Sequence, residues 1–212
     1  MRLQSIKYMF LLMMAAVTLA SCSEEEPETV DEYANWQARN DQAFADTIAK
    51  AKANADGLWW TYRSYSLDNQ TPTQEGTSIS YGDNTSIAVH VEKEGAGVVS
   101  PLVTDSVKVS YQGRLIPTAF SSDGSIFDGT FASSGVYDEN TALTANFKVG
   151  DLVDGFATAL LHMHVGDHWK VFIPYDLGYG SSTSNSAIPA YSMLRFEIVL
   201  RGYYHDGKWI GQ

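Results

Sequence analysis

A group of histidines is the first feature that could do chemistry. His162, His164 and His168 lie close together with Asp167 beside them, and such side chains are common metal ligands. His162 and His164 are two residues apart at the end of an expected helix, so their side chains point roughly 200° apart around its axis. They could share a metal ion only on a strand. The sequence therefore favours an interpretation without a metal site.

Carboxylates and the cysteine suggest other chemistries. Asp123, Asp128 and Glu139 could form a glycosidase-type pair, but aspartates are common in loops and the sequence does not predict their separation. The chain has no Gly-rich phosphate loop and no Gly-x-Ser-x-Gly nucleophile motif. Its single cysteine excludes internal disulfides and multi-cysteine metal sites. We expect no cofactor.

Composition limits the classes of protein further. The chain has 212 residues, 44% of them apolar, with 14 basic and 25 acidic side chains. This length and apolar content predict one folded domain with a small appendage and exclude general disorder. A net charge of −11 argues against the clustered basic surface that nucleic-acid binding requires. We expect no nucleic-acid partner.

The first residues form a targeting segment. Arg2 and Lys7 precede an apolar run over 8–20, which is shorter than the ~20 residues that span a bilayer as a helix. The following Leu19-Ala20-Ser21-Cys22 resembles a bacterial lipobox, which implies cleavage before Cys22 and a diacylglycerol on its sulfur. We therefore predict a lipoprotein signal peptide over 1–21. A plain signal peptide that happens to contain Cys22 is the alternative.

An acidic tether follows the cysteine. Residues 22–30 carry the triplet Glu24-Glu25-Glu26 and a proline, so they read as a lipidated linker. The triplet resembles a surface-export signal of some diderm bacterial lipoproteins, and a solvated tether is the equal alternative. Because the chain is acidic, the lipid rather than electrostatic attraction would hold it at an anionic membrane.

A helix is expected next, in a region over 31–86 that also includes connecting segments. Residues 31–56 contain no Pro or Gly, and apolar side chains recur at three- and four-residue steps from Tyr33 and Trp36 to Ile48 and Ala51. Gly57 is placed to end the helix. Its apolar stripe either packs on its own domain or serves a homodimer or client capture.

The rest of the chain reads as β-rich. Strand-like residues occupy 59–62, and alternating apolar residues predict strands near 87–92, 107–112, 169–173 and 194–200, each with one buried face. Apolar spacing over 152–163 predicts one short amphipathic helix between them. The sequence thus predicts an α+β domain with an antiparallel sheet over a helix.

Four motifs in order carry a resemblance to a known family. They are VKVSYQGRL from Val107, GF from Gly155 with Met163 and Gly166 after it, IPYDLGYG from Ile173, and IPAYSMLRFE from Ile188. This pattern resembles the FKBP-type peptidyl-prolyl cis–trans isomerases over about 87–202. The resemblance implies a half-barrel sheet wrapped around the short helix, in a domain over 87–204 followed by a C-terminal tail over 205–212.

The resemblance also implies a set of site residues. It places Tyr111, Phe127 and Asp128 in an apolar pocket with Phe156 as its aromatic floor. It makes the backbone N–H of Val153 and the hydroxyl of Tyr179 donors to a bound chain. The remaining positions are expected to line the pocket: Leu152, Ile188 and Phe196.

Some positions depart from the family pattern. Most members have tryptophan where this chain has Phe156, and the segment 150–155 is about two residues short. The loops over 117–124 and 133–141 are longer than usual, and the loop over 181–187 is small and polar. We expect an altered rim and a changed preference for the residues around proline.

The resemblance implies an isomerase that assists the folding of exported, proline-containing polypeptides. A twisted X–Pro amide is less charge-separated than a planar one, so a dry aromatic pocket favours the twisted form without a nucleophile or metal. A non-catalytic client-binding or accessory lipoprotein on the same fold is the alternative. The leader predicts an outer-membrane lipoprotein that faces either the periplasm or the cell surface.

Overall fold

The computed structural model describes residues 31–68, 79–132, 135–182 and 187–211. The predicted signal peptide, Cys22 and the tether lie outside these residues, as does most of the loop over 181–187. Within the described part, no helix has the length and apolar character needed to cross a membrane.

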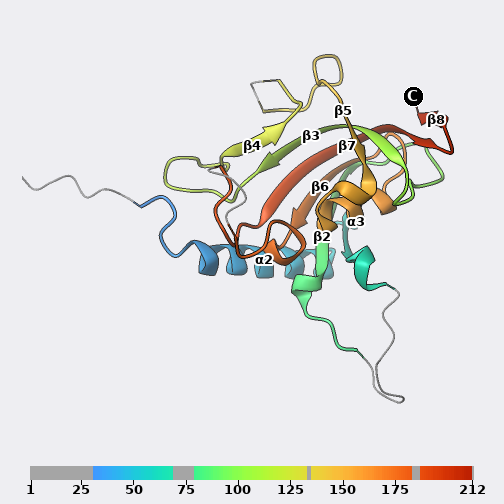
Figure 1. The fold of residues 1–212 in the computed structure, drawn as a ribbon. Helices are drawn as coiled ribbons and strands as arrows, with labels where there is room; N and C mark the ends of the chain where they lie inside the picture. Colours follow the sequence, from blue (N-terminus) through green and yellow to red (C-terminus); the bar gives the residue numbers. More distant parts are fainter. Residues whose placement is uncertain (1–30, 69–78, 133–134, 183–186, 212) are drawn as a thin grey trace, which may run out of the picture. The chain divides into compact units, whose positions relative to one another are not determined.

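Eight strands of the described residues form one antiparallel sheet (Figure 1). The spatial order is β1-β2-β6-β7-β3-β4, while β5 pairs with β3 and β8 pairs with β7. The strands are β1 (Trp59–Arg63), β2 (Ser86–Lys93), β3 (Ser106–Arg114), β4 (Ile126–Gly129), β5 (Ala145–Lys148), β6 (His168–Ile173), β7 (Leu194–His205) and β8 (Lys208–Gly211). The predicted α+β class with an antiparallel sheet is confirmed.

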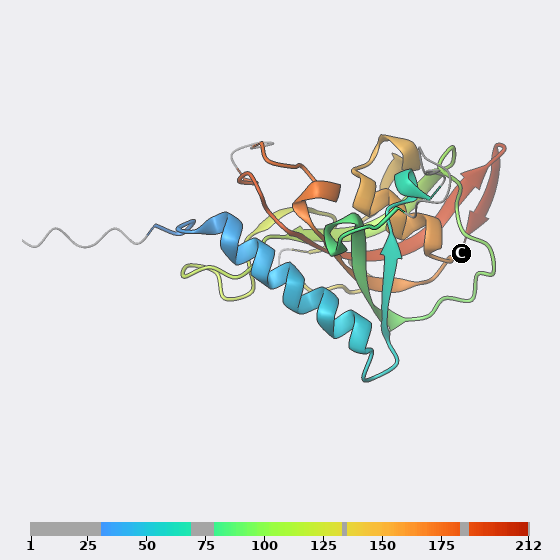
Figure 2. The same ribbon diagram turned by 90° about the horizontal axis from the view of Figure 1, so that it is seen from below.

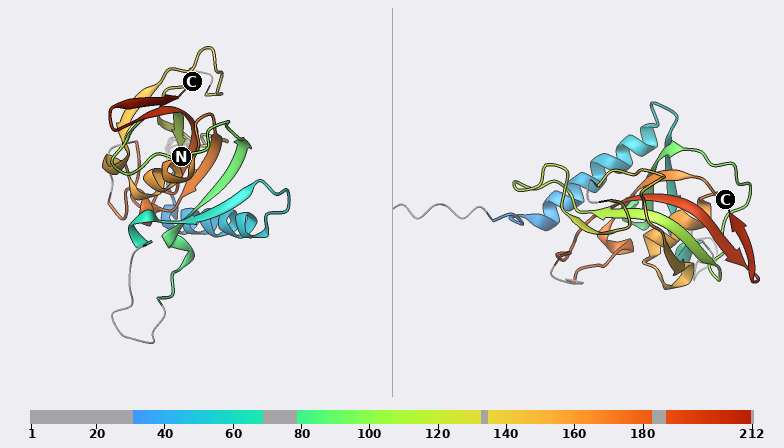
Figure 3. Two further views of the ribbon diagram at one scale, coloured as in Figure 1. Left: turned by 90° about the vertical axis from the view of Figure 1, so that its right-hand side faces the viewer. Right: turned by 90° about the horizontal axis from the view of Figure 1, so that it is seen from above.

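The sheet curves around one short helix, α3 (Asp154–His162), as the left view of Figure 3 shows. Alternation points Val107 and Val109 of β3 and Ile198 and Leu200 of β7 to the same side, and all four are buried. Leu160 of α3 is fully buried in the same core. Short 3₁₀ turns connect the elements: Tyr65–Leu67, Asp83–Thr85, Val149–Asp151 and Tyr175–Leu177.

The N-terminal helix α2 (Trp36–Ala53) packs against β1, β2 and β6 (Figure 2). Its buried side chains include Trp36, Phe44, Ile48 and Ala51, so the apolar stripe is used within the chain. The helix ends at Ala53, four residues before Gly57, because Asn54 takes a left-handed conformation and donates its N–H to Lys50 O at 3.1 Å. Gly57, expected to end the helix, lies in the turn that follows.

Strand β2 is buried on both faces, unlike the one-sided strand that we predicted. Val89 faces the main core, and its neighbour Ala88 on the opposite face is also fully buried. Ala88 packs with Ala51 of α2 and Trp59 of β1, and Phe172 lies against them. Helix α2 therefore covers part of the outer surface of the sheet.

The predicted region boundaries fall inside continuous structure. Trp59–Arg63 pairs with Ser86–His90, so the sheet includes a strand from the region that we placed before residue 87. Residues 205–212, expected to be a tail, contain the end of β7 and strand β8, joined by a turn at Asp206 and Gly207 with φ of 49° and 74°. Asp-Gly suits such a turn because both residues tolerate positive φ.

Candidate functional site

Five aromatic side chains meet on the inner face of the sheet, and we call them the aromatic cluster: Tyr111, Phe127, Phe147, Phe156 and Phe196. The Phe156 and Phe196 ring centroids are 4.9 Å apart, and those of Phe127 and Phe196 are 5.5 Å apart. Tyr111 lies 6.0 Å from Phe156 and 5.5 Å from Phe147. Most of these pairs are edge-to-face, which is favourable for aromatic rings.

Five elements supply the rings of the cluster: β3, β4, β5, β7 and α3. Tyr111 on β3 and Phe196 on β7 face inward by strand alternation, and Phe156 lies in the first turn of α3. Gly113 pairs with Phe196, and a Cβ on Gly113 would lie 2.5 Å from the Phe127 ring and 2.7 Å from that of Phe196. The absence of a side chain at Gly113 therefore lets these two rings meet.

Asp128 connects β4 to the cluster. The Tyr111 hydroxyl donates to Asp128 Oδ2 at 2.6 Å, and the Gly129 N–H donates to Asp128 Oδ1 at 2.8 Å. Burial raises the pKa of Tyr111, and the hydrogen bond to the Asp128 carboxylate raises it further. Tyr111 therefore stays protonated, with its hydroxyl directed at Asp128.

Tyr179 follows the 3₁₀ turn after β6. Its side chain is 41% exposed, and Gly180 beside it has φ of 74°, a conformation that glycine adopts readily. Partial burial raises the pKa of Tyr179, and the negative charge of Asp128 adds to that rise. The hydroxyl is thus a protonated donor within the electrostatic reach of Asp128.

Leu152 and Val153 lie directly before α3. Both are half-buried, and the Val153 carbonyl accepts the N–H groups of Phe156 and Ala157 at 3.0 Å each. In the described part of the chain, the Val153 N–H has no hydrogen-bond partner, as is usual for the first amides of a helix. The shortened segment forms the 3₁₀ turn Val149–Asp151, which leads directly to these two residues.

The other predicted site residue, Ile188, is buried in the main core, next to Pro189. The structure therefore brings Tyr111, Phe127, Phe156 and Phe196 into contact, with Asp128 bound to Tyr111. Sequence reasoning missed Phe147. Phe147 could have been recognised from the short alternation in Ala145–Lys148, where it is half-buried between the exposed residues Asn146 and Lys148.

In the part of the chain that the structure describes, these histidines contact an aromatic ring or a carboxylate. His162 stacks on Tyr62 with ring centroids 4.0 Å apart, and His168 Nε2 lies 2.7 Å from Glu197 Oε1. No group of three or more His, Cys, Asp or Glu side chains in that part of the chain is arranged to hold a metal ion.

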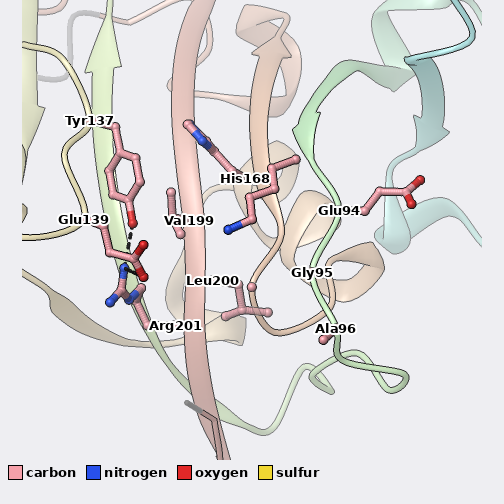
Figure 4. Close-up of a pocket in the computed structure, with 11 residues that line it drawn as sticks. Glu94, Gly95, Ala96, Tyr137, Glu139, His168, Val199, Leu200 and Arg201 are labelled. Atoms are coloured by element: carbon pink, nitrogen blue, oxygen red, sulfur yellow. Dashed lines mark hydrogen bonds and ion pairs between the residues drawn. The ribbon is translucent and has the colours of Figure 1, made fainter.

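A separate polar cavity lies on the outer face of the sheet (Figure 4). Its volume is about 230 Å³, and its lining includes Val199 and Arg201, which point away from the side that Phe196 faces. Arg201 Nη1 donates to the Tyr137 hydroxyl at 2.6 Å and lies 3.8 Å from Glu139. These groups interact with one another, and the cavity is distinct from the aromatic cluster.

A sheet curved around one helix, with aromatic rings on its inner face, defines an FKBP-like class of fold. A crystal structure of a peptidyl-prolyl cis–trans isomerase from Pseudomonas syringae pv. tomato shares this fold. Its TM-score is 0.54 and its identity 22%, over 84% of this chain and 99% of that one.

Sequence comparisons identify the family. Residues 98–201 match the family model of FKBP-type peptidyl-prolyl cis–trans isomerases. The FK506-binding protein 1A of Neurospora crassa is 31% identical over 116 residues, 55% of this chain and 87% of that protein. The chain therefore belongs to the FKBP-type peptidyl-prolyl cis–trans isomerase family.

Some relatives are considerably longer. The outer membrane protein MIP of Legionella longbeachae is 35% identical over 100 residues, 47% of this chain and 37% of that protein. Two further relatives are matched over 51% and 46% of their lengths. The chain thus spans about half the length, or less, of these curated relatives.

Proposed function

We propose that this protein is a peptidyl-prolyl cis–trans isomerase that assists the folding of exported, proline-containing chains. The observation that carries the proposal is the aromatic cluster at the N-terminus of α3, with Tyr111 hydrogen-bonded to Asp128. Family membership supports the same activity.

The chemistry requires no bond to be broken. Rotation of the X–Pro amide crosses a barrier of ~18–20 kcal/mol because it removes amide resonance. The planar amide is more charge-separated than the twisted one, so an apolar aromatic surface disfavours the planar ground state more than the twisted transition state. Such differential binding is what accelerates a reaction.

Each site residue then has a physical role. Phe156 is the floor under the proline ring, and Phe127, Leu152, Ile188 and Phe196 complete the apolar walls. The N–H of Val153, which has no partner among the described residues, and the hydroxyl of Tyr179 donate to carbonyls on either side of the rotating bond. Asp128 orients Tyr111 and sets the local charge, and it does not act as a base because no proton moves.

A peptide assay tests this proposal. The protein without its first 22 residues should accelerate cis-to-trans isomerisation of short peptides that vary at the residue before proline. Phe156→Ala should lower kcat/KM by at least about tenfold, because a large part of the apolar contact is lost. Phe172→Ala is the matched control: this ring lies on the outer face, so the variant should keep its activity while folded.

The contrary outcome is equally clear. If the wild type accelerates neither peptides nor a refolding reaction limited by proline, the isomerase proposal fails. A non-catalytic binding module on this fold would then remain, and client binding without turnover would identify it.

We also propose that the protein is an exported lipoprotein of the bacterial envelope, anchored to the outer membrane through Cys22. The lipobox-like sequence supports this, as does a relative that is named as an outer membrane protein. Radiolabelled palmitate should enter the wild type and not Cys22→Ser, and the variant should leave the membrane fraction. Labelling of Cys22→Ser, or an unlabelled wild type, would contradict the anchor.

A homodimer through α2 remains a prediction. The apolar stripe of α2 is buried within the chain, so a dimer would have to use the exposed, polar side of the helix. Light scattering on the soluble protein would detect it.

A further inference from the structure

Helix α2 holds the segment that leads into β7. The Trp36 Nε1–H donates to Ser192 Oγ at 2.9 Å, and the Met193 N–H donates to Asn40 Oδ1 at 2.8 Å. All four residues are buried, with Asn40 only 1% and Ser192 only 3% exposed. In Figure 1 this orange-red segment lies beside the first turns of α2. These contacts join residues more than 150 positions apart in the chain.

The two bonds belong to a complete buried network. Asn40 Nδ2 donates to Trp36 O at 2.7 Å, and Ser192 Oγ donates to Pro189 O at 2.6 Å. Every member therefore has a partner, and removing one leaves a buried polar group unsatisfied. The network runs from the backbone of α2 to the residue next to Ile188.

The same segment continues toward Tyr179. Tyr191 has φ of 61°, an unfavourable conformation for a bulky residue, and its N–H donates to Gly180 O at 3.0 Å. Such a conformation persists only when its surroundings hold it. The hydrogen bonds of Ser192 and Met193 hold the residues that follow Tyr191, and Gly180 is adjacent to Tyr179.

A second contact reaches the loop before β4. Arg39 Nη2 donates to Pro117 O at 2.8 Å, and the Thr118 hydroxyl donates to Glu32 Oε1 at 2.7 Å. The α2 region therefore holds a loop on the Asp128 side of the site as well as the Ile188–Met193 segment.

We infer that α2 is a positioning element of the isomerase site, and that Trp36 and Asn40 are its positioning residues. They hold the Ile188–Met193 segment in the conformation that places Ile188 and Tyr179 for a bound proline. The inference rests on the proposed function and adds to it: substrate affinity depends on a helix outside the family-matched region 98–201. Interactions that preorganise a site improve binding because less ordering remains to be done when the substrate arrives.

The test separates KM from kcat. Trp36→Phe removes the indole N–H and keeps a ring, and Ser192→Ala removes the same bond from its other end. Each should raise KM about two- to tenfold, the effect of one hydrogen bond, with kcat within about twofold. Asn40→Leu should also raise KM. Asn40→Asp should raise KM less than Asn40→Leu does, because it keeps the acceptor for the Met193 N–H.

A matched variant controls for stability. Ile48→Val truncates a buried residue of α2 away from the network, so it should lower the unfolding midpoint and leave KM unchanged. All assays are run well below the unfolding midpoint of every variant. The inference would be overturned if Trp36→Phe and Ser192→Ala had the same KM as the wild type, or if Ile48→Val raised KM as much as they do. Neither result would affect the proposed isomerase activity. A wild type without activity would instead overturn the proposed function, and the inference with it.

Discussion

The Tyr111–Asp128 pair determines the charge distribution around the aromatic cluster. The 2.6 Å hydrogen bond directs the Tyr111 hydroxyl to the carboxylate, and the Gly129 N–H holds the other carboxylate oxygen. Asp128 also raises the pKa of Tyr179, a residue that is 41% exposed. One carboxylate thus acts on two tyrosines from different elements of the fold, and it adds to the rise in pKa that burial causes in both.

Asp128→Asn removes this charge and keeps the side-chain shape. The pKa of Tyr111 should fall toward its usual value of 10, and that of Tyr179 should fall with it. We expect kcat/KM on peptides to fall roughly three- to tenfold, less than for a buried oxyanion-hole donor because Asp128 is exposed. Ultraviolet titration of the tyrosines and the peptide assay measure both effects. An unchanged tyrosine titration would contradict the assigned electrostatic role.

Gly113→Ala tests the close approach of two rings. The added Cβ would lie 2.5 Å from the Phe127 ring and 2.7 Å from the Phe196 ring, so one or both rings must move. We expect a loss of stability of about 1–3 kcal/mol, as for overpacking, and a lower kcat/KM. Gly150→Ala is the control, because a Cβ there meets no ring and makes only one tight contact, with Val103 O at 3.2 Å. Urea unfolding of both variants would decide; equal stability of Gly113→Ala and the wild type would refute the packing argument.

The elements differ in how well the sequence predicts them. Strands β3, β6 and β7 were predictable because apolar residues alternate with other residues along their sequences. Strands β4 and β5 were not, because each has four residues and most of them are exposed. The hairpin of β7 and β8 has a recognisable turn sequence in Asp206-Gly207, which favours two antiparallel strands on either side.

The grouping of the aromatic side chains with Asp128 was predictable for a different reason. Its rings and its aspartate were found through the order and spacing of family motifs, because packing alone would explain each aromatic residue equally well. Phe147 was not predicted because it lies on the short strand β5. The role of Trp36 and Asn40 could not be predicted either, since it depends on hydrogen bonds across more than 150 residues.

Helix α3 is joined to β1 through an aromatic contact. The His162 ring stacks on Tyr62 at 4.0 Å, and Trp169 lies behind Tyr62 at 5.9 Å. Burial lowers the pKa of His162 below its usual 6.5. Below pH 6.5 this histidine is therefore protonated in the unfolded chain while it is still neutral in the folded chain. The free energy of unfolding consequently falls as the pH falls from 6.5 toward the lower pKa of the folded state.

His162→Phe keeps a ring on Tyr62 and removes the titration. We expect the variant to lose less stability than the wild type between pH 7.5 and pH 5.5, measured by urea unfolding at each pH. The comparison with the wild type isolates His162, because other groups titrate equally in both proteins. The pKa of His205 is raised by its hydrogen bond to Asp105, which gives the opposite slope in both. Parallel pH curves would show that His162 does not contribute.

At the scale of the described molecule, the residues before β2 are part of the domain. They provide α2, strand β1 and the two hydroxyls that bind Asp154 at the start of α3, from Ser64 at 2.7 Å and Ser66 at 2.6 Å. Helix α2 also covers the outer face at Ala88, and its side chains hold the segment before β7. The family-matched region 98–201 contains neither these elements nor strand β2.

Truncation tests whether this region is structural. A chain that begins at Glu32 keeps every element listed above and should unfold at the same midpoint as the chain that begins at Ser23. A chain that begins at Ser86 leaves β2 as an edge strand, exposes Ala88 and Phe172, and removes both hydroxyl partners of Asp154. The shorter chain loses this apolar burial and these hydrogen bonds, whereas a domain is stable by only about 5–15 kcal/mol in total. We therefore expect it to aggregate or to lack a cooperative thermal transition by circular dichroism. If it instead unfolds at the midpoint of the longer chains and isomerises peptides with the same KM, then α2 and β1 are dispensable additions, and the site is complete within residues 86–212.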